Sequence, residues 1–267
     1  MKYGPRRILV TGHFGSGKTE FAVSLAFALS GFLPGAAASK ADADGTATGT
    51  AATDKELLHE TKLALADLDI ENPYFRSRER QDDLNAAGVK VYSDPFGGRN
   101  GSELQTISAA VLAPLEDADT RIIMDTGGDK SGAMVLNQFS RHFHGEYQLL
   151  SVVNCNRPGT DTVEKALDQI RDAETVTGLK FTGLISNAHM IKWTTPEDVV
   201  RGWEFTRKVS EASGIPVLCA CAQEKVAKEL EAMMEGGVRE LYGTDISGME
   251  IFRIGMYMRA SYLDKQV

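Results

Sequence analysis

The segment Gly12-His13-Phe14-Gly15-Ser16-Gly17-Lys18-Thr19 constrains most strongly how this 267-residue chain can fold. It matches the pattern G-x-x-x-x-G-K-[ST], in which a glycine-rich turn joins a buried strand to a helix. The apolar residues 7–11 predict that strand, and the pattern over residues 18–30 predicts the helix. Because the backbone N–H groups of such a turn point inward at a helix N-terminus, we expect this segment to bind a polyphosphate.

Two side chains of this loop have separate expected tasks. Lys18 is expected to reach the β- and γ-phosphates of a nucleotide, and the Thr19 hydroxyl is expected to ligate Mg²⁺. The residues expected to contact the nucleotide here are Gly12, His13, Phe14, Gly15, Ser16, Gly17, Lys18, Thr19 and Glu20.

Net charge, hydropathy and cysteine content indicate which classes of protein this chain is not expected to belong to. The net charge of −8 gives no reason to expect a nucleic-acid partner. No apolar run approaches the roughly 20 residues that span a bilayer, so no integral membrane segment is expected. Three cysteines are too few for a disulfide framework, and the first predicted strand begins too early to leave room for a signal peptide. A cytoplasmic protein is the natural expectation.

Apolar runs alternate with amphipathic stretches along the chain and predict its fold class. We expect strands over residues 8–11, 63–69, 89–93, 121–125, 148–154, 181–187 and 215–218. We expect helices over residues 18–30, 103–113, 160–177, 196–213 and 224–235. Short apolar strands separated by helices predict a three-layer, doubly wound α/β fold with a mostly parallel sheet of about seven strands. A ligand would then bind at the carboxyl ends of the strands, where the glycine-rich loop lies.

The organisation of the chain suggests one unit with an inserted loop. We expect residues 1–267 to form a single nucleotide-binding domain. Residues 34–53 are small, polar and free of aromatic side chains, which predicts a flexible low-complexity loop within it. Near the C-terminus, Ile251, Ile254, Met258 and Tyr262 share a helical face, but residues 252–258 also alternate as a strand would, so this element stays open.

A second motif follows the apolar run 121–125. That strand ends in Asp125 and is followed by Thr126-Gly127-Gly128. Such a strand delivers an aspartate to the phosphate end of the sheet, where it can hold Mg²⁺ directly or through water. A buried strand that simply ends in a turn aspartate is the alternative. The phosphate loop upstream favours the metal role, so Thr19 and Asp125 are the predicted metal-binding residues.

A third motif combines two carboxylates. The strand over 63–69 ends in Asp67 and Asp69, whose side chains point to the same face because they lie two positions apart. Beside a polyphosphate, one could orient the attacking water and the other could act on the metal's shell. The alternative is an acidic strand end that caps the next helix.

The order of these three motifs resembles the ParA/MinD-like (SIMIBI class) P-loop ATPases, over about residues 7–235. The resemblance implies that Asp69 is the catalytic aspartate, acting with Lys18 and Asp125. The segment Gly183-Leu184-Ile185-Ser186-Asn187 resembles the family strand that ends in an asparagine reading adenine, so Asn187 is implied to contact the base. The implied cofactors are ATP and Mg²⁺.

The phosphate loop departs from this family at one position. Typical members carry a second lysine, in a Lys-Gly-Gly-x-Gly-Lys pattern, that reaches the partner's phosphates across a nucleotide-dependent homodimer. This chain has His13 there, and histidine carries only a partial charge at neutral pH. The departure predicts slow hydrolysis or a different cation, for which Lys130 is one candidate. The homodimer itself stays an expectation.

Guanine specificity and metal loading are competing interpretations. GTPases of the neighbouring branch, such as the hydrogenase and urease accessory proteins, read guanine with Asn-Lys-x-Asp. Here Asn187 is followed by Ala188-His189-Met190, without the aspartate, which favours adenine. Cys219 and Cys221 could form half of a metal site that a second subunit completes, but two thiolates alone do not close a tetrahedral shell, and buried apolar cysteines are the alternative.

The sequence therefore predicts a Mg²⁺-dependent ATP-binding protein and slow ATPase that acts as a nucleotide switch for an unidentified client protein, in maturation or positioning. Three alternatives stay open: an ATP-using small-molecule kinase or ligase, a GTPase metallochaperone, and a nucleotide-binding interaction module without turnover.

Overall fold

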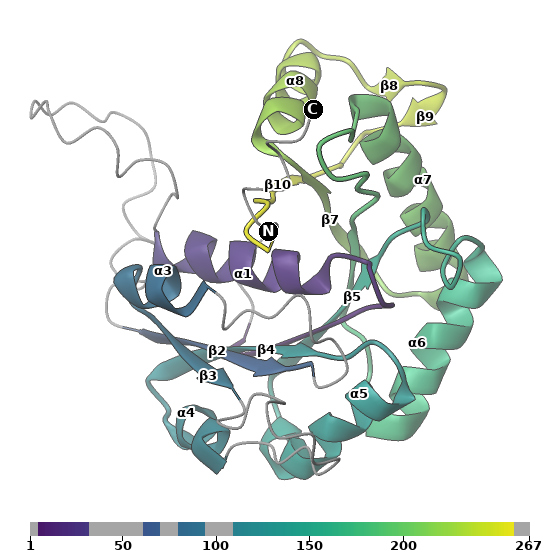
Figure 1. Cartoon of the computed structure of the whole chain (residues 1–267). Helices are drawn as coiled ribbons and strands as arrows, with labels where there is room; N and C mark the ends of the chain where they lie inside the picture. The colour runs from purple at the N-terminus through teal and green to yellow at the C-terminus, as the bar shows by residue number, and fades with distance from the viewer. Residues whose placement is uncertain (1–4, 32–60, 70–79, 94–108, 259–267) are drawn as a thin grey trace, which may run out of the picture.

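The computed structural model describes residues 5–31, 61–69, 80–93 and 109–258 (Figure 1). Within these ranges, eight strands form one sheet in the order β10-β7-β6-β5-β1-β4-β2-β3, and every neighbouring pair is parallel. The strands are β1 (Arg7–Thr11), β2 (Lys62–Leu68), β3 (Val89–Ser93), β4 (Thr120–Thr126), β5 (Tyr147–Val153), β6 (Gly183–Ser186), β7 (Val217–Ala222) and β10 (Ile251–Arg253). The predicted fold class is confirmed, with β10 as an additional strand.

Helices cover both faces of this sheet (Figure 1). They are α1 (Lys18–Ser30), α3 (Gln81–Ala86), α4 (Leu112–Glu116), α5 (Lys130–Met134), α6 (Val163–Thr177), α7 (Pro196–Ser213) and α8 (Glu224–Glu235). Two 3₁₀ segments, η3 (Ala109–Val111) and η4 (Val135–Phe143), and a small hairpin of β8 (Glu240–Leu241) and β9 (Thr244–Asp245) complete the described part. Helices α1 and α3 lie over one face, and α4, α5 and α6 lie over the other (Figure 1).

The central strand β1 shows how the two faces of the core are built. Ile8 and Val10 pack with Phe21 of α1 in one apolar cluster, whereas Leu9 packs in the cluster on the opposite face. Side chains of a strand alternate between faces, so a strand covered on both sides must be apolar at every position. Helix α1 is itself buried along nearly its whole length, which explains why its sequence lacks a polar face.

Several predicted elements agree with the structure to the residue, namely Lys18–Ser30, Val89–Ser93, Pro196–Ser213 and Glu224–Glu235. Helix α6 begins later than predicted because the Thr162 hydroxyl caps it, accepting from the backbone N–H of Lys165. The prediction that the last core strand ends at residue 218 is wrong, because β7 continues through buried residues to Ala222. For the predicted helix 103–113, only residues from 109 onward are described, and they form η3 and the start of α4. The predicted loop 34–53 lies outside the described residues.

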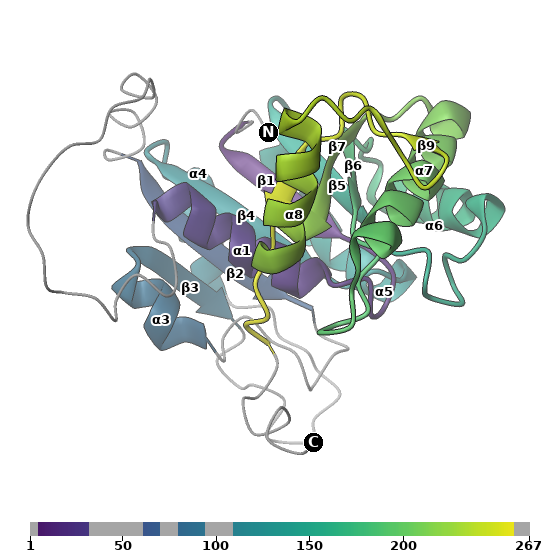
Figure 2. The same ribbon diagram turned by 90° about the horizontal axis from the view of Figure 1, so that it is seen from above.

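The C-terminal element, for which the sequence allowed either a helix or a strand, is a strand of three residues. Ile251–Arg253 form β10, which pairs with β7 at the sheet edge. Residues 254–258 then leave the sheet, and Figure 2 shows this yellow end of the described chain crossing α1. Tyr262, the last residue of the helical pattern, lies outside the described residues.

Candidate nucleotide-binding site

The glycine-rich loop connects β1 to α1 at the carboxyl end of the sheet. Its turn is closed by a hydrogen bond from the backbone N–H of Ser16 to the carbonyl of His13, at 2.9 Å. Gly17 precedes α1 with φ of +86°, a left-handed conformation that favours glycine. A Cβ at this position would also overlap the Asn187 amide. The loop therefore requires glycine immediately before Lys18, as the motif predicts.

Lys18 and Asp69, two of the predicted catalytic residues, meet directly. The Lys18 ammonium lies 2.8 Å from an Asp69 carboxylate oxygen, and the two side chains are only 5% and 3% exposed. Asp69 directly follows β2, so the end of this strand delivers it to the start of α1. Lys18 thus already has a buried counter-charge, which an incoming phosphate would have to replace.

Asp125, the predicted metal ligand, is a buried carboxylate in β4 beside this pair. Neither of its oxygens makes a hydrogen bond of regular geometry to a described residue. Burial raises its pKa to about 8, nearby Lys18 opposes the rise, and the charges of Asp67 and Asp69 add to it. The Thr19 hydroxyl lies near enough to lower this pKa slightly. An orphaned buried carboxylate next to a hydroxyl fits the oxygen ligands that Mg²⁺ prefers.

The segment after β4 packs tightly on the glycine-rich loop. The Thr11 hydroxyl donates to the Gly127 carbonyl at 3.0 Å, and the Thr126 hydroxyl donates to the Val10 carbonyl at 3.1 Å. A Cβ at Gly128 would overlap the carbonyl oxygen of Gly12, so only glycine allows this approach. The two predicted motifs are therefore in direct backbone contact.

Two cavities flank the loop, and Lys18 lines both. The polar cavity, about 630 Å³, is bounded by charged residues of the loop, of the segment after β4 and of α6. Its lining includes His13, Phe14, Asp69, Gly127, Gly128, Asp129, Lys130, Lys165, Asp168, Gln169 and Asp172. The apolar cavity, about 220 Å³, has an outer wall of aliphatic and methionine side chains. Its lining includes Gly15, Gly17, Thr19, Glu20, Arg157, Asn187, His189, Ile191, Gln223, Ile254, Met256 and Met258.

Two side chains from other loops, Asn187 and Arg157, hold the glycine-rich loop on the side of the apolar cavity, and His189 lies beside them. The Asn187 amide donates to the Ser16 carbonyl at 2.8 Å, and Arg157 Nε donates to the Gly15 carbonyl at 2.7 Å. Asn187 is 1% exposed, and its Oδ1 has no hydrogen-bond partner among the described residues. Burial, and then the charge of Arg157, lower the pKa of His189 to about 4, so this ring is neutral. Neither Arg157 nor His189 was predicted from the sequence as a site residue.

Glu20, expected among the nucleotide contacts, also holds the C-terminal part of the chain. Its carboxylate accepts from the backbone N–H groups of Tyr257 and of Met258, the latter at 3.1 Å. Ser24, one turn later, accepts from the backbone N–H of Gly255 at 3.0 Å. These bonds fix residues 254–258 across α1, where they form the outer wall of the apolar cavity. Burial raises the pKa of Glu20 to about 7.

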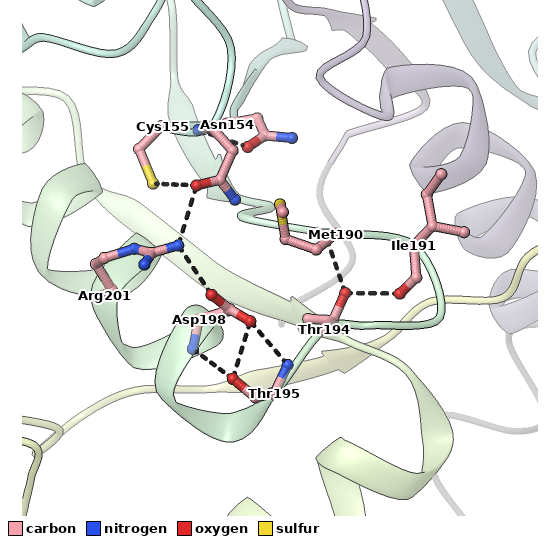
Figure 3. A network of polar contacts seen from close by, with 9 residues as sticks. Asn154, Cys155, Met190, Ile191, Thr194, Thr195, Asp198 and Arg201 are labelled. Atoms are coloured by element: carbon pink, nitrogen blue, oxygen red, sulfur yellow. Dashed lines mark hydrogen bonds and ion pairs between the residues drawn. The ribbon is translucent and has the colours of Figure 1, made fainter.

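The loop between β6 and α7 forms another wall of the apolar cavity. Figure 3 shows the polar contacts within this loop and at the start of α7. Ile191 lies in it with φ of +55°, a strained conformation for a β-branched residue. The Thr194 hydroxyl donates to the Ile191 carbonyl at 2.7 Å, and the Gln223 amide donates to the same carbonyl at 3.1 Å. Thr195 and Asp198 then cap α7 reciprocally. Two hydrogen bonds to the Ile191 carbonyl therefore hold the strained residue in place.

The remaining residues that the sequence suggested for the site make no contact with a described residue that would support a role there. Lys130 lines the polar cavity but pairs with Asp172 at 3.2 Å, and both side chains are exposed. Cys219 and Cys221 are buried in the core beneath α1, where a second subunit cannot reach them. Among the described residues, no group of three or more His, Cys, Asp or Glu side chains could hold a metal ion. Phe14 is 64% exposed at the tip of the loop.

No protein-family model matches this chain, and no curated protein sequence matches it either. Solved structures do match it at low identity. Chloroplast FtsY from Physcomitrella patens matches with 17% identity and a TM-score of 0.47, over 81% of this chain and 58% of that chain. Cell division protein FtsY from Thermotoga maritima matches with 18% identity and a TM-score of 0.41, over 80% and 62%.

A third match is a nucleotide-binding protein in complex with ADP from Archaeoglobus fulgidus, with 14% identity and a TM-score of 0.35, over 67% of this chain and 65% of that chain. This chain thus spans less than two thirds of the length of each of these three proteins. At these identities and TM-scores, the matches assign no role to any residue. In the part of the chain that the structure describes, no helix combines the length and the hydropathy that crossing a bilayer requires.

Proposed function

We propose that this protein binds Mg²⁺ and ATP, hydrolyses ATP slowly, and acts as a nucleotide switch for a client protein in maturation or positioning. One observation carries the proposal: the glycine-rich loop, the buried Lys18–Asp69 pair and the orphaned Asp125 carboxylate converge between an apolar and a polar cavity. An apolar space for a base on one side of a phosphate loop, and a charged space on the other, suit a nucleoside triphosphate.

In this proposal, the Lys18–Asp69 ion pair opens when phosphate arrives. The Lys18 ammonium turns to the β- and γ-phosphates, which releases the Asp69 carboxylate to orient a water molecule. Thr19 and Asp125 would hold Mg²⁺, which neutralises part of the phosphate charge when bound. The pKa of Asp125, raised to about 8 by burial, would fall on metal binding, because a cation favours the ionised carboxylate.

The apolar cavity would take the base. Ile254, Met256 and Met258 supply a flat, adaptable apolar wall, and the buried Asn187 amide faces the same cavity. The chain offers no aspartate at the position that would accept from guanine, which favours adenine. This is the basis for proposing ATP rather than GTP.

The segment after β4 would carry the switch. Gly128 touches the phosphate loop, and its carbonyl accepts from Gln169 of α6 at 3.1 Å. A change at the γ-phosphate would therefore reach a helix that also lines the polar cavity. We propose that the client protein, or a second copy of the chain in a homodimer, reads this change.

A second candidate function, an ATP-using small-molecule kinase or ligase, is favoured by the polar cavity. Its volume of about 630 Å³ lies beside the proposed γ-phosphate position and could admit an acceptor molecule. Most of its charged side chains already have protein partners, for example Lys165 with Asp161 and Asp129 at the start of α5. We therefore rank it second.

Titration of the purified full chain with ATP and with GTP tests the proposal, with Mg²⁺ and with excess EDTA. We expect ATP to bind more tightly than GTP, Mg²⁺ to strengthen binding, and phosphate to be released slowly in the absence of any acceptor. Absence of binding for both nucleotides would refute the proposed function. Phosphate transfer to an added acid or alcohol, with no release to water, would favour the kinase or ligase.

A further inference from the structure

Arg157 lies against the glycine-rich loop in a position that the proposed function does not yet use. Its Nε donates to the Gly15 carbonyl at 2.7 Å, and a Cβ at Gly15 would lie 3.2 Å from the guanidinium carbon. The structure gives Nη1 and Nη2 no hydrogen bond or ion pair with a described residue, and neither nitrogen is among the buried atoms without a partner. The guanidinium is therefore held on the loop through Nε, while the N–H groups of Nη1 and Nη2 can still donate hydrogen bonds to a ligand.

The turn that carries Arg157 is firmly held. The Thr160 hydroxyl donates to the Asn154 carbonyl at 2.7 Å, and the backbone N–H of Thr160 donates to the Arg157 carbonyl at 2.9 Å. Asn154 and Thr160 are both buried. A charged side chain on such a turn is placed before any ligand arrives, which lowers the entropic cost of binding.

Charge in the apolar cavity is scarce. Among the described residues that line it, only Lys18 and Arg157 carry a full positive charge, because burial keeps His189 neutral. Lys18 is paired with Asp69, so Arg157 is the unpaired cation of this cavity. Asn187, whose buried Oδ1 also lacks a partner among the described residues, lines the same cavity. Both features indicate a polar ligand group at the inner end of this cavity.

We infer that Arg157 binds the first phosphate of the nucleotide, the one attached to the ribose, and supplies from within the chain a positive charge that His13 does not. Arg157 lines the apolar cavity and not the polar one, so it reaches the phosphate nearest the nucleoside rather than the γ-phosphate. The inference rests on the proposed nucleotide binding. It also replaces Lys130 as the compensating cation, since Lys130 is exposed and paired with Asp172.

Calorimetric titration of adenosine, ADP and ATP separates this role from a merely structural one. Arg157→Met should weaken both ADP and ATP by about tenfold, the size of one charge-assisted hydrogen bond, and should leave adenosine unchanged. Arg157→Lys should recover part of the loss, because it keeps the charge without the planar fork. Arg207→Met is the matched control, since Arg207 is a partly exposed arginine of α7 that lines neither cavity.

Three results would overturn the inference while wild-type protein still binds ATP. An equal loss for adenosine would mean that Arg157 only shapes the loop. A loss confined to ATP would place its charge on the last phosphate. Unchanged ADP and ATP affinities would remove the contact altogether. Failure of the wild type to bind any nucleotide would instead refute the proposed function.

Discussion

The two cavities on either side of the glycine-rich loop differ in the origin of their walls. The polar cavity is built by the carboxyl ends of β2 and β4, which carry predicted motifs, and by α6, which carries none. The apolar cavity is closed by residues 254–258 and by the loop after β6, in which only Asn187 belongs to a predicted motif. Charged residues that follow buried strands form patterns that can be recognised in a sequence. The residues of an apolar wall, in contrast, cannot be told from those of an ordinary hydrophobic core.

This difference also appears in how each wall is held. Direct ion pairing and backbone contact fix the polar side, as in Lys18–Asp69 and Gly128 on Gly12. The apolar side depends on hydrogen bonds from Glu20 and Ser24 to the backbone of a segment far along the chain. We expect substitutions on the polar side to remove function, and those on the apolar side to change its degree.

Loss of the Lys18 charge should give the largest effect. Lys18→Ala should weaken ATP binding by at least about 100-fold in calorimetry, because a buried charge-assisted contact to two phosphates is lost. Asp69 would also lose its counter-charge, so the variant's thermal unfolding should be measured beside its binding. Retained ATP affinity in a folded variant would contradict the assignment of the phosphate site.

Asp69 should separate binding from turnover on the same polar side. Asp69→Asn keeps the shape of the side chain but removes the carboxylate that would orient water. We expect ATP affinity within a few-fold of wild type and phosphate release slowed by about 100-fold, the usual range for a lost acid–base group. The catalytic role would be withdrawn if phosphate release were unchanged.

On the apolar side, Glu20 should make the free energy of unfolding depend on pH. The ordinary pKa of glutamate, 4.5, applies to the unfolded chain, and burial raises that of the folded protein to about 7. Between these values the folded protein holds a proton that the unfolded chain has lost, so the free energy of unfolding should fall as pH rises and level off above about 7. Glu20→Gln should remove up to about 3 kcal/mol of this dependence.

Urea unfolding of the wild type and of Glu20→Gln at pH 5, 6, 7 and 8 measures the difference. Asp125, with its pKa of about 8, contributes a slope of the same sign that persists in the variant. The comparison between the two proteins therefore isolates Glu20. Parallel pH profiles would show that the carboxyl group is not buried as described.

The smallest effect should come from the strained residue of the apolar side. Ile191→Gly should raise the free energy of unfolding by about 0.5–1 kcal/mol, because glycine adopts φ of +55° without a Cβ penalty. It should also weaken ATP slightly, since Ile191 lines the apolar cavity. Tyr242→Gly is the matched control: Tyr242 has φ of +52° and is exposed away from both cavities, so stability should rise with ATP affinity unchanged. A destabilised Tyr242→Gly would show that positive φ is not the source of the effect.

The sequence alone predicted the bounds of those elements whose apolar pattern and end residues lie within the element itself. Helices α7 and α8 and strand β3 were predicted to the residue, because apolar spacing and turn residues mark their ends. Segments α5 and η4 were not predicted, since five residues are too short for a helical pattern and a 3₁₀ segment does not follow the α-helical period.

In the site, Lys18 and Asp69 were predicted as one catalytic set and do meet, because parallel strands deliver their ends to one edge of the sheet. The observed contacts of Arg157 and of Glu20 could not be predicted from sequence. Their contacts join residues 142 and 238 positions apart, and no spacing rule reports such pairs. The roles of the whole set stay predictions until the variants above are measured.

The hydrogen bond between the Glu20 carboxylate and the backbone of Met258 has a consequence for the order in which the site forms during synthesis on the ribosome. Glu20 lies 238 positions before Met258, so the glycine-rich loop is synthesised long before its neighbouring wall. Contacts of such high sequence separation form late, because the entropy of closing the intervening chain must be met first. The proposed nucleotide site is therefore assembled in two stages: the glycine-rich loop can form early, whereas the proposed base cavity cannot close until residue 258 has been made.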